Sequence, residues 1–509
     1  MYLQKIWTLI SIKLWTCYVL MSKAQSWLRR WLRPTTLSDS LPDITRLRQD
    51  LTFRRSHRLQ NGRPDSSKID YRLLRLAKQA ETADIFVTFH EGMEGILQSV
   101  QESRYASRDE ILNAMHSGLI GLATRVQTNV RSYLQGRFEF KSLWITNQVY
   151  VKGATMDLIM ILASFTEVNS LELEEIIELD TIVEGPILRG KPIPEHEWGV
   201  RKIQAPEARE LLGSLSIKGS QVVVSTIDTG ARHTHEALRD NWAGDYGWFD
   251  PYDANSLPMD INGHGTHTTA TIAGKLGVGV FPDAKWTSCR GCASSSCAQN
   301  ALLACAQFIA CPTRPDGSAP DCTKAPNLVS NSWGGGRGAT WFDGAIAAFH
   351  TAKIIPLFSI GNSGPSCNTA NSPGDRDVIG VASTTVSDEL SSFSSVGPTT
   401  DGRMKPDVSA PGSNVLSAYN TADDAYRALS GTSMACPHVS GLISLLLTYD
   451  INLSYANVTS FMRRGVDQDL VDQEKTCSGI PDNQFPNYHH GEGRINALKS
   501  LQLLINASQ

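Results

Sequence analysis

The sequence predicts an α/β fold, a parallel sheet covered by helices on both faces, preceded by a smaller α+β domain. From residue 219 to about 504, short β-branched runs alternate with helical stretches, as in parallel sheets buried on both sides. One such run, 221–227, ends in Asp228, so that a buried strand delivers a carboxylate at its carboxyl end. The expected strands are 221–227, 327–331, 354–360 and 377–382, and the expected helices are 266–273, 298–310, 341–351 and 433–448.

The smaller domain is expected between residues 85 and 180. Its predicted elements, in order, are a strand at 85–90, a helix from Ser107 to about Leu134, a strand or hairpin at 143–152, a helix at 156–165 and a strand at 171–179. The long helix opens with a capping box, Ser107-Arg-Asp-Glu110, in which two side chains satisfy free backbone amides. This order is that of a split ferredoxin-like domain.

Bulk properties limit the class of protein. A chain of 509 residues is too long for one ordinary domain. Its 41% hydrophobic content supports full cores, and a net charge of −4 argues against binding nucleic acid.

The ten cysteines indicate an exported protein with disulfides, because seven of them cluster between Cys289 and Cys367. A zinc site is the alternative, since Cys289 and Cys292 have CxxC spacing and Cys297 follows, but no second pair or histidine is in register. Cys436 is expected to be a buried free thiol. Without it and Cys17, eight cysteines remain, compatible with four bridges of open connectivity.

The N-terminus is expected to carry a targeting segment. Residues 1–24 are apolar and lack acids, which favours a secretory signal cut after Ala24. The alternatives are a retained membrane anchor, although the apolar run is shorter than the ~20 residues needed to span, and an organellar presequence, because residues 1–38 hold six Lys or Arg and no acid. Residues 25–80 are expected to be a basic linker. Three glycosylation sequons begin at Asn452, Asn457 and Asn506.

Three separated stretches carry the candidate chemistry. Ser433 opens an apolar helix, where unpaired amides and the helix dipole suit a reaction that develops negative charge on oxygen. Pro437 lies in the opening turns, and the carbonyl that it displaces is that of Ser433 itself. Asp228 follows a strand and His264 opens a helix. The order Asp, His, Ser is one of the known orders of a catalytic triad.

The segments around Asp228, His264 and Ser433, together with Ser359–Gly364, resemble the four signatures of subtilisin-like serine proteases (subtilases). The runs Cys289–Trp333 and Gly361–Gly374 are most similar to the bacillopeptidase F-like branch. The resemblance implies a subtilisin-like three-layer fold. The preceding α+β domain, 81–185, resembles an inhibitor I9-type propeptide, followed by a processing linker at 186–197 and a catalytic domain at 198–509.

The resemblance also implies a role for each site residue. Ser433 would be the nucleophile, His264 the general base, and Asp228 the group that orients the imidazole. Asn362 would bind the oxyanion. Substrate contacts are implied for four residues: Ser332, Trp333, Gly334 and Gly361.

The function expected on these grounds is that of a secreted, monomeric serine endopeptidase. It would act on polypeptides, carry its own propeptide as an intramolecular inhibitor, and cleave that propeptide within 183–197. No cofactor is required, and structural calcium is compatible with the family. One alternative is a catalytically inactive subtilase-fold binding protein. An α/β-hydrolase is the other, but it needs GxSxG where this chain has GTSMA.

Other histidines have structural interpretations. His267 forms an HxxH pair with His264, and we expect a packed or partly exposed helix residue there because no third metal ligand is in view. His438 is expected to make a structural hydrogen bond. His233 and His235 are expected at the surface.

Overall fold

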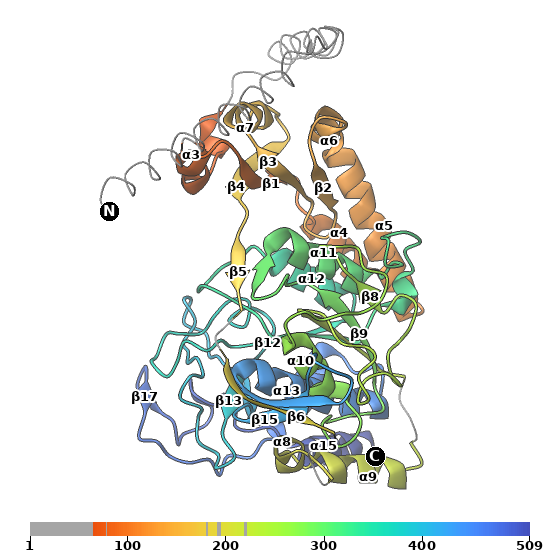
Figure 1. Ribbon diagram of the computed structural model, residues 1–509, viewed down its shortest axis with the longest axis vertical. Helices are drawn as coiled ribbons and strands as arrows, with labels where there is room; N and C mark the ends of the chain where they lie inside the picture. The colour runs from red at the N-terminus through yellow and green to blue at the C-terminus, as the bar shows by residue number, and fades with distance from the viewer. Residues whose placement is uncertain (1–64, 78, 180–181, 191–194, 218–220) are drawn as a thin grey trace, which may run out of the picture. The chain divides into compact units, whose positions relative to one another are not determined.

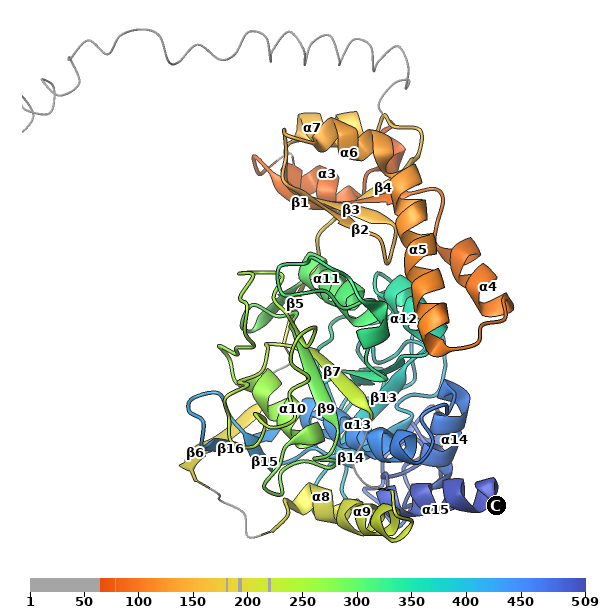
Figure 2. The same cartoon turned by 90° about the vertical axis from the view of Figure 1, so that its right-hand side faces the viewer.

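The computed structural model describes residues 65–77, 79–179, 182–190, 195–217 and 221–509, in an N-terminal α+β domain and a larger α/β domain (Figures 1 and 2). The predicted signal segment 1–24 and the linker up to residue 64 lie outside the described residues. Within the described ranges, no helix has the length and apolar character needed to cross a membrane.

The larger domain is built on a seven-stranded sheet of order β14-β13-β12-β11-β7-β9-β8, in which every neighbouring pair is parallel. This confirms the predicted α/β class. The strands are β7 (Val223–Asp228), β8 (Trp248–Phe249), β9 (Lys285–Arg290), β11 (Leu328–Asn331), β12 (Ile355–Ser359), β13 (Ile379–Thr384) and β14 (Val408–Pro411).

Helices cover both faces of this sheet because successive strand residues point to opposite sides. In β12, Leu357 belongs to the core on the side of α10 (His264–Ala273) and α13 (Thr432–Tyr449). The next residue, Phe358, belongs to the core on the side of α11 (Gln299–Ala310) and α12 (Asp343–Thr351). Both cores are buried, which explains why the central strands are apolar without alternation.

Several elements of the larger domain were not predicted. Strand β9, Lys-Trp-Thr-Ser-Cys-Arg, lacks a β-branched run. Its polar residues bond to distant parts of the chain, as Arg290 does to Asp250. The other unpredicted elements are β8 and β14 of the sheet, together with α8 (Trp198–Lys202), α9 (Ala205–Ser214), β10 (Ser296–Ala298), η2 (Cys322–Lys324), β15 (Val415–Ala418), β16 (Ala425–Ser430), α14 (Tyr455–Arg464), β17 (Thr476–Cys477), β18 (Ile480–Pro481) and α15 (Ala497–Ser508).

The N-terminal domain has an antiparallel sheet of order β2-β3-β1-β4, the ferredoxin-like arrangement. Its elements are β1 (Ala83–Phe89), α4 (Glu94–Glu102), α5 (Arg108–Val126), α6 (Thr128–Leu134), β2 (Phe140–Leu143), β3 (Gln148–Ala154), α7 (Met156–Leu162) and β4 (Val168–Leu173). The helix expected from Ser107 to Leu134 divides at Gln127. That buried side chain hydrogen-bonds Asn147 and Ser142 instead of facing solvent.

The N-terminal domain begins earlier than the sequence indicated. Within the stretch expected to be linker, Ser66–Lys68 forms η1 and Tyr71–Ala77 forms α3. Leu73 is fully buried, and Ile69 forms a bridge to Leu171 of β4. In the sequence, the arginines around this short apolar stripe made the segment resemble a basic linker, so the helix was not predicted.

The strand predicted at 171–179 divides between the two domains. Its first part is β4, whereas β5 (Ile176–Glu178) pairs antiparallel with β10 of the larger domain. The next segment, expected to be a joint, contains β6 (Val183–Arg189), which pairs antiparallel with β16.

Four disulfides among the described residues confirm the expectation of disulfide bonds. They join Cys289 to Cys305, Cys292 to Cys297, Cys311 to Cys322, and Cys367 to Cys477. The alternative of a zinc site at Cys289, Cys292 and Cys297 is therefore wrong. Cys436 is a buried free thiol, as predicted. Over the described ranges, one group of potential ligands gathers, His116 with Cys311 and Cys322, and its two cysteines are bonded to each other.

Candidate active site

The adjacent ends of β7 and α10 bring Asp228 and His264 together. Asp228 is the last residue of β7 and His264 the first of α10. The helix can approach the strand because Gly265 has no side chain: a Cβ there would lie 2.1 Å from the carbonyl oxygen of Gly230. The amide of Gly265 also donates to Thr229 Oγ1 at 2.9 Å. A residue larger than glycine would separate the two groups.

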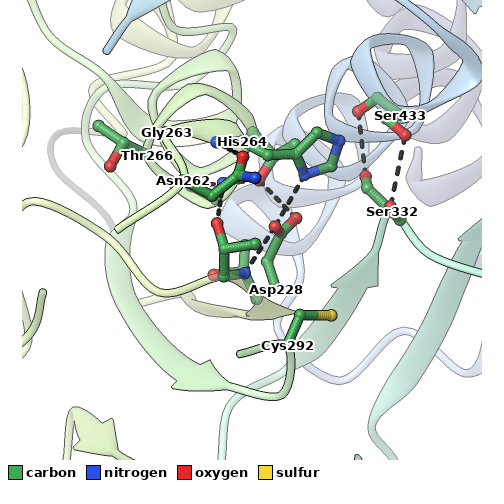
Figure 3. Close-up of polar contacts among 12 residues, drawn as sticks. Asp228, Asn262, Gly263, His264, Thr266, Cys292, Ser332 and Ser433 are labelled. Atoms are coloured by element: carbon green, nitrogen blue, oxygen red, sulfur yellow. Dashed lines mark hydrogen bonds and ion pairs between the residues drawn. The ribbon is translucent and has the colours of Figure 1, made fainter. Parts of the chain in front are cut away.

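The carboxylate of Asp228 is buried and fully engaged. Oδ1 lies 2.8 Å from His264 Nδ1 and accepts a 2.7 Å bond from the amide of Thr229. Oδ2 accepts from Thr268 Oγ1 at 3.1 Å. Figure 3 shows the imidazole held between this carboxylate and the side of the site on which Ser433 lies. The contact fixes which ring nitrogen faces Asp228, the arrangement that a general-base histidine needs.

A second carboxylate, Asp260, supports both segments and was missed by the sequence reasoning. Its Oδ1 accepts from Thr229 Oγ1 and from the amides of Asn262 and Gly263. Its Oδ2 accepts from the amide and hydroxyl of Thr266. These five hydrogen bonds come from the segment that follows Asp228 and from the segment around His264. Asp260 therefore holds the two segments together and keeps the Asp228–His264 contact rigid. The loop spacing Asp-x-Asn-Gly-His was the available signal.

Ser433 lies in the first turn of α13 and is 1% exposed. Its Oγ donates to the carbonyl of Ser332 at 3.3 Å, and Ser332 Oγ donates to the carbonyl of Ser433 at 3.0 Å (Figure 3). Pro437 cannot donate to that carbonyl, so Ser332 takes the place of the missing amide. The structure thereby links the nucleophile candidate to a predicted substrate-binding residue.

Asn362 lies beside the start of α13. Its Oδ1 accepts two hydrogen bonds from Thr432, from the amide at 2.9 Å and from the hydroxyl at 2.8 Å. The Nδ2 group lies 3.2 Å from where a Cβ on Gly431 would be. Thr432 therefore orients the amide so that its NH₂ group lies against the backbone leading to Ser433, where an oxyanion donor is needed.

Of the predicted substrate-binding residues, Trp333 lies in the core and not on the surface of a pocket. Its side chain is 1% exposed and packs on Phe342 and Phe358 in the core beneath the site. Gly334 does line a cavity of about 700 Å³, together with Gly335, Gly336, Asn371 and others. Gly361 does not line it. It has φ +105°, and a Cβ there would lie 2.5 Å from Asn371 Nδ2, so Asn371, which the sequence did not reveal, fills the space that Gly361 leaves.

The other histidines that the sequence analysis considered make structural contacts. His267 is buried, its Nε2 lies 2.9 Å from the carbonyl of Val415, and burial lowers its pKa to about 3. His438 hydrogen-bonds the carbonyl of Met434 at 2.8 Å, as expected. The expectation for His235 was wrong: it is buried, because its two ring nitrogens bridge to Ala425 and Ala237. His233 is half-buried.

A parallel α/β sheet that holds a buried Asp–His pair beside a serine at a helix N-terminus matches the arrangement of a serine hydrolase. The family profile of the subtilases matches residues 219–480, which is more than half of the chain. The chain therefore belongs to the subtilase family.

Three relatives illustrate this membership. Bacillopeptidase F of Bacillus subtilis (strain 168) is 31% identical over 332 residues, which cover 60% of this chain and 22% of that protein. Thermitase of Thermoactinomyces vulgaris is 30% identical over 313 residues, which cover 60% of this chain and 96% of that protein. Cerevisin of Saccharomyces cerevisiae is 30% identical over 354 residues, which cover 68% of this chain and 51% of that protein. The chain thus spans about a fifth of bacillopeptidase F, half of cerevisin and nearly all of thermitase.

Proposed function

We propose that this protein is a serine endopeptidase that hydrolyses polypeptides through an acyl-enzyme. Ser433 attacks the peptide carbonyl, and His264 takes its proton and returns it to the leaving amine. Asp228 stabilises the imidazolium that forms. Asn362 and the amide of Ser433 bind the tetrahedral oxyanion. The observation that carries the proposal is the buried 2.8 Å contact between Asp228 and His264 beside the helix-terminal Ser433.

The substrate backbone is proposed to bind as a β-strand. β5 supports this, because it pairs with β10 in the manner of a bound peptide, and the amide of Leu179 donates to the carbonyl of Ser295 at 2.7 Å. Residues Glu175–Glu178 also line the cavity that contains Gly334–Gly336. The N-terminal domain would then be an inhibitory propeptide whose last strand occupies the substrate cleft.

Self-cleavage is proposed between Leu179 and Ile182, upstream of the window expected from sequence. Before this point, β5 and Leu179 run along β10. After it, β6 runs along β16, with Val183 opposite Ser430, three residues before Ser433. Ile182 packs against the apolar cluster that contains Met434 of α13. The strand before the proposed cleavage point and the strand after it thus pair with different parts of the larger domain, as the two halves of a substrate would.

Secretion and a monomeric state are part of the same proposal. Four disulfides in the described residues favour an oxidising compartment.

The test is active-site labelling of purified protein with a biotinylated fluorophosphonate, followed by hydrolysis of an internally quenched peptide. We expect labelling and turnover in the wild type and in Ser366→Ala, a variant at an exposed serine, and neither in Ser433→Ala. A folded wild type that neither labels nor cleaves would favour the inactive binding protein. Cleavage restricted to chain ends would exclude an endopeptidase.

A further inference from the structure

Arg108, the first residue of α5, inserts its side chain between two segments of the larger domain. Its three guanidinium nitrogens each donate to a different main-chain carbonyl: Nε to Ala352 at 3.3 Å, Nη1 to Ala325 at 3.1 Å, and Nη2 to Pro326. No other hydrogen bond in the described ranges reaches these three oxygens. We call the carbonyls of Ala325, Pro326 and Ala352 the arginine socket.

The socket suits a cation because of where its carbonyls lie. Ala352 follows the last residue of α12, and Ala325 follows the last residue of η2. Carbonyls at helix C-termini lack intrahelical partners and lie at the negative end of the helix dipole. A planar guanidinium presents several donors in a fixed fork, and can therefore satisfy three separated acceptors at once. A lysine ammonium cannot span them in the same way.

The contact is part-buried, and Arg108 has no carboxylate partner in the described part of the chain. Burial lowers the pKa of Arg108 to about 10, so that the guanidinium stays charged at neutral pH. Without the guanidinium, three part-buried carbonyl oxygens would lose their donor, which is costly. The socket thus recognises arginine strongly and penalises its replacement.

Neighbouring contacts make the socket part of a larger interface between α4–α5 and the larger domain. Gln101 donates to Thr351 at 2.8 Å. Leu97 and Met115 share one buried core with Phe349 of α12. Figure 2 shows α4 and α5 beside α12, while β5 enters the domain elsewhere. The N-terminal domain therefore contacts the larger domain through α4 and α5 as well as through the β5–β10 pairing, and one buried core joins the two regions.

We propose that the arginine socket is a guanidinium-binding site of the catalytic domain, and that Arg108 in it retains the propeptide after self-cleavage. This inference rests on the proposed self-processing. Cutting between Leu179 and Ile182 frees one end of β5, whereas it leaves the Arg108 contacts untouched. The socket then sets how long the cut protease stays latent, and the mature domain exposes a site for arginine side chains once the propeptide has left.

The test compares full-length wild type, Arg108→Ala, Arg108→Lys and Arg104→Ala. Arg104 is a matched control, because it is exposed and makes no hydrogen bond or ion pair to any described residue. Mass spectrometry follows the cut, size-exclusion chromatography follows propeptide retention, and the lag before peptide hydrolysis reports release. We expect normal cutting in all four, release at least ten-fold faster in Arg108→Ala, intermediate release in Arg108→Lys, and wild-type release in Arg104→Ala.

Circular dichroism of each variant in the Ser433→Ala background identifies any loss of fold. If Arg108→Ala is unfolded, the inference is decided by comparing the rate of propeptide release in Arg108→Lys with that in Arg104→Ala. Equal release from Arg108→Lys, Arg108→Ala and Arg104→Ala, with normal cutting, overturns the inference alone. An uncut wild-type chain overturns the proposed self-processing and this inference with it.

Discussion

Replacing Asn362 by leucine is predicted to lower kcat by about 10²–10³, or about 2.7–4 kcal/mol in the barrier, because one oxyanion donor is lost. The geometry supports a specific loss, because two hydrogen bonds from Thr432 to Oδ1 fix the orientation of the Asn362 amide. KM should change little, since this donor acts chiefly in the transition state. The assay is steady-state hydrolysis of a quenched peptide by the mature enzyme, normalised to fluorophosphonate-titrated sites.

Two variants separate the donor from its support. Asn362→Asp keeps an acceptor for Thr432 but removes the NH₂ group and adds a negative charge, so it should lose at least as much activity as Asn362→Leu. Thr432→Val removes one of the two supporting bonds and should cost only about five-fold, near 1 kcal/mol. An Asn362→Asp enzyme with near-normal kcat, or an Asn362→Leu loss confined to KM, would refute the oxyanion role.

Two further predictions concern stability, measured by urea unfolding in the Ser433→Ala background to prevent self-digestion. Burial lowers the pKa of His438 to about 4, so the unfolded chain takes up this proton first, and the contribution of His438 to the unfolding free energy should fall by up to about 3 kcal/mol between pH 6.5 and pH 4. His438→Gln should show a shallower fall over that range, and an unchanged slope would exclude the buried neutral histidine. The Cys367–Cys477 bridge closes a separation of 110 residues and Cys292–Cys297 one of 5. In the chain-entropy view, replacing the first pair by alanines should therefore cost about 3 kcal/mol more than replacing the second, and equal losses would contradict that view.

The sequence was most informative where the chemistry is local. Asp228 ends a β-branched strand and His264 opens a small-residue helix, and both patterns are visible within a few residues. Ser433 and Pro437 likewise share one turn, and the structure shows the released carbonyl taken by Ser332.

The sequence was least informative where partners lie far apart along the chain. β5 and β6 were expected to be a propeptide strand and a joint, but their pairing partners lie more than a hundred residues away, in β10 and β16. Trp333 stands among pocket residues in sequence, yet its size and apolarity place it in the core with Phe342. Long-range packing of this kind leaves no periodic signal.

The central claim is that Ser433 cleaves its own chain between Leu179 and Ile182. The direct measurement is the intact mass and N-terminal sequence of the full-length protein and its Ser433→Ala variant, expressed in a secreting host. The account predicts a wild-type product beginning at residue 180, 181 or 182, and a variant uncut in this region. Identical cutting in both proteins, or a first cut after residue 189, would contradict it.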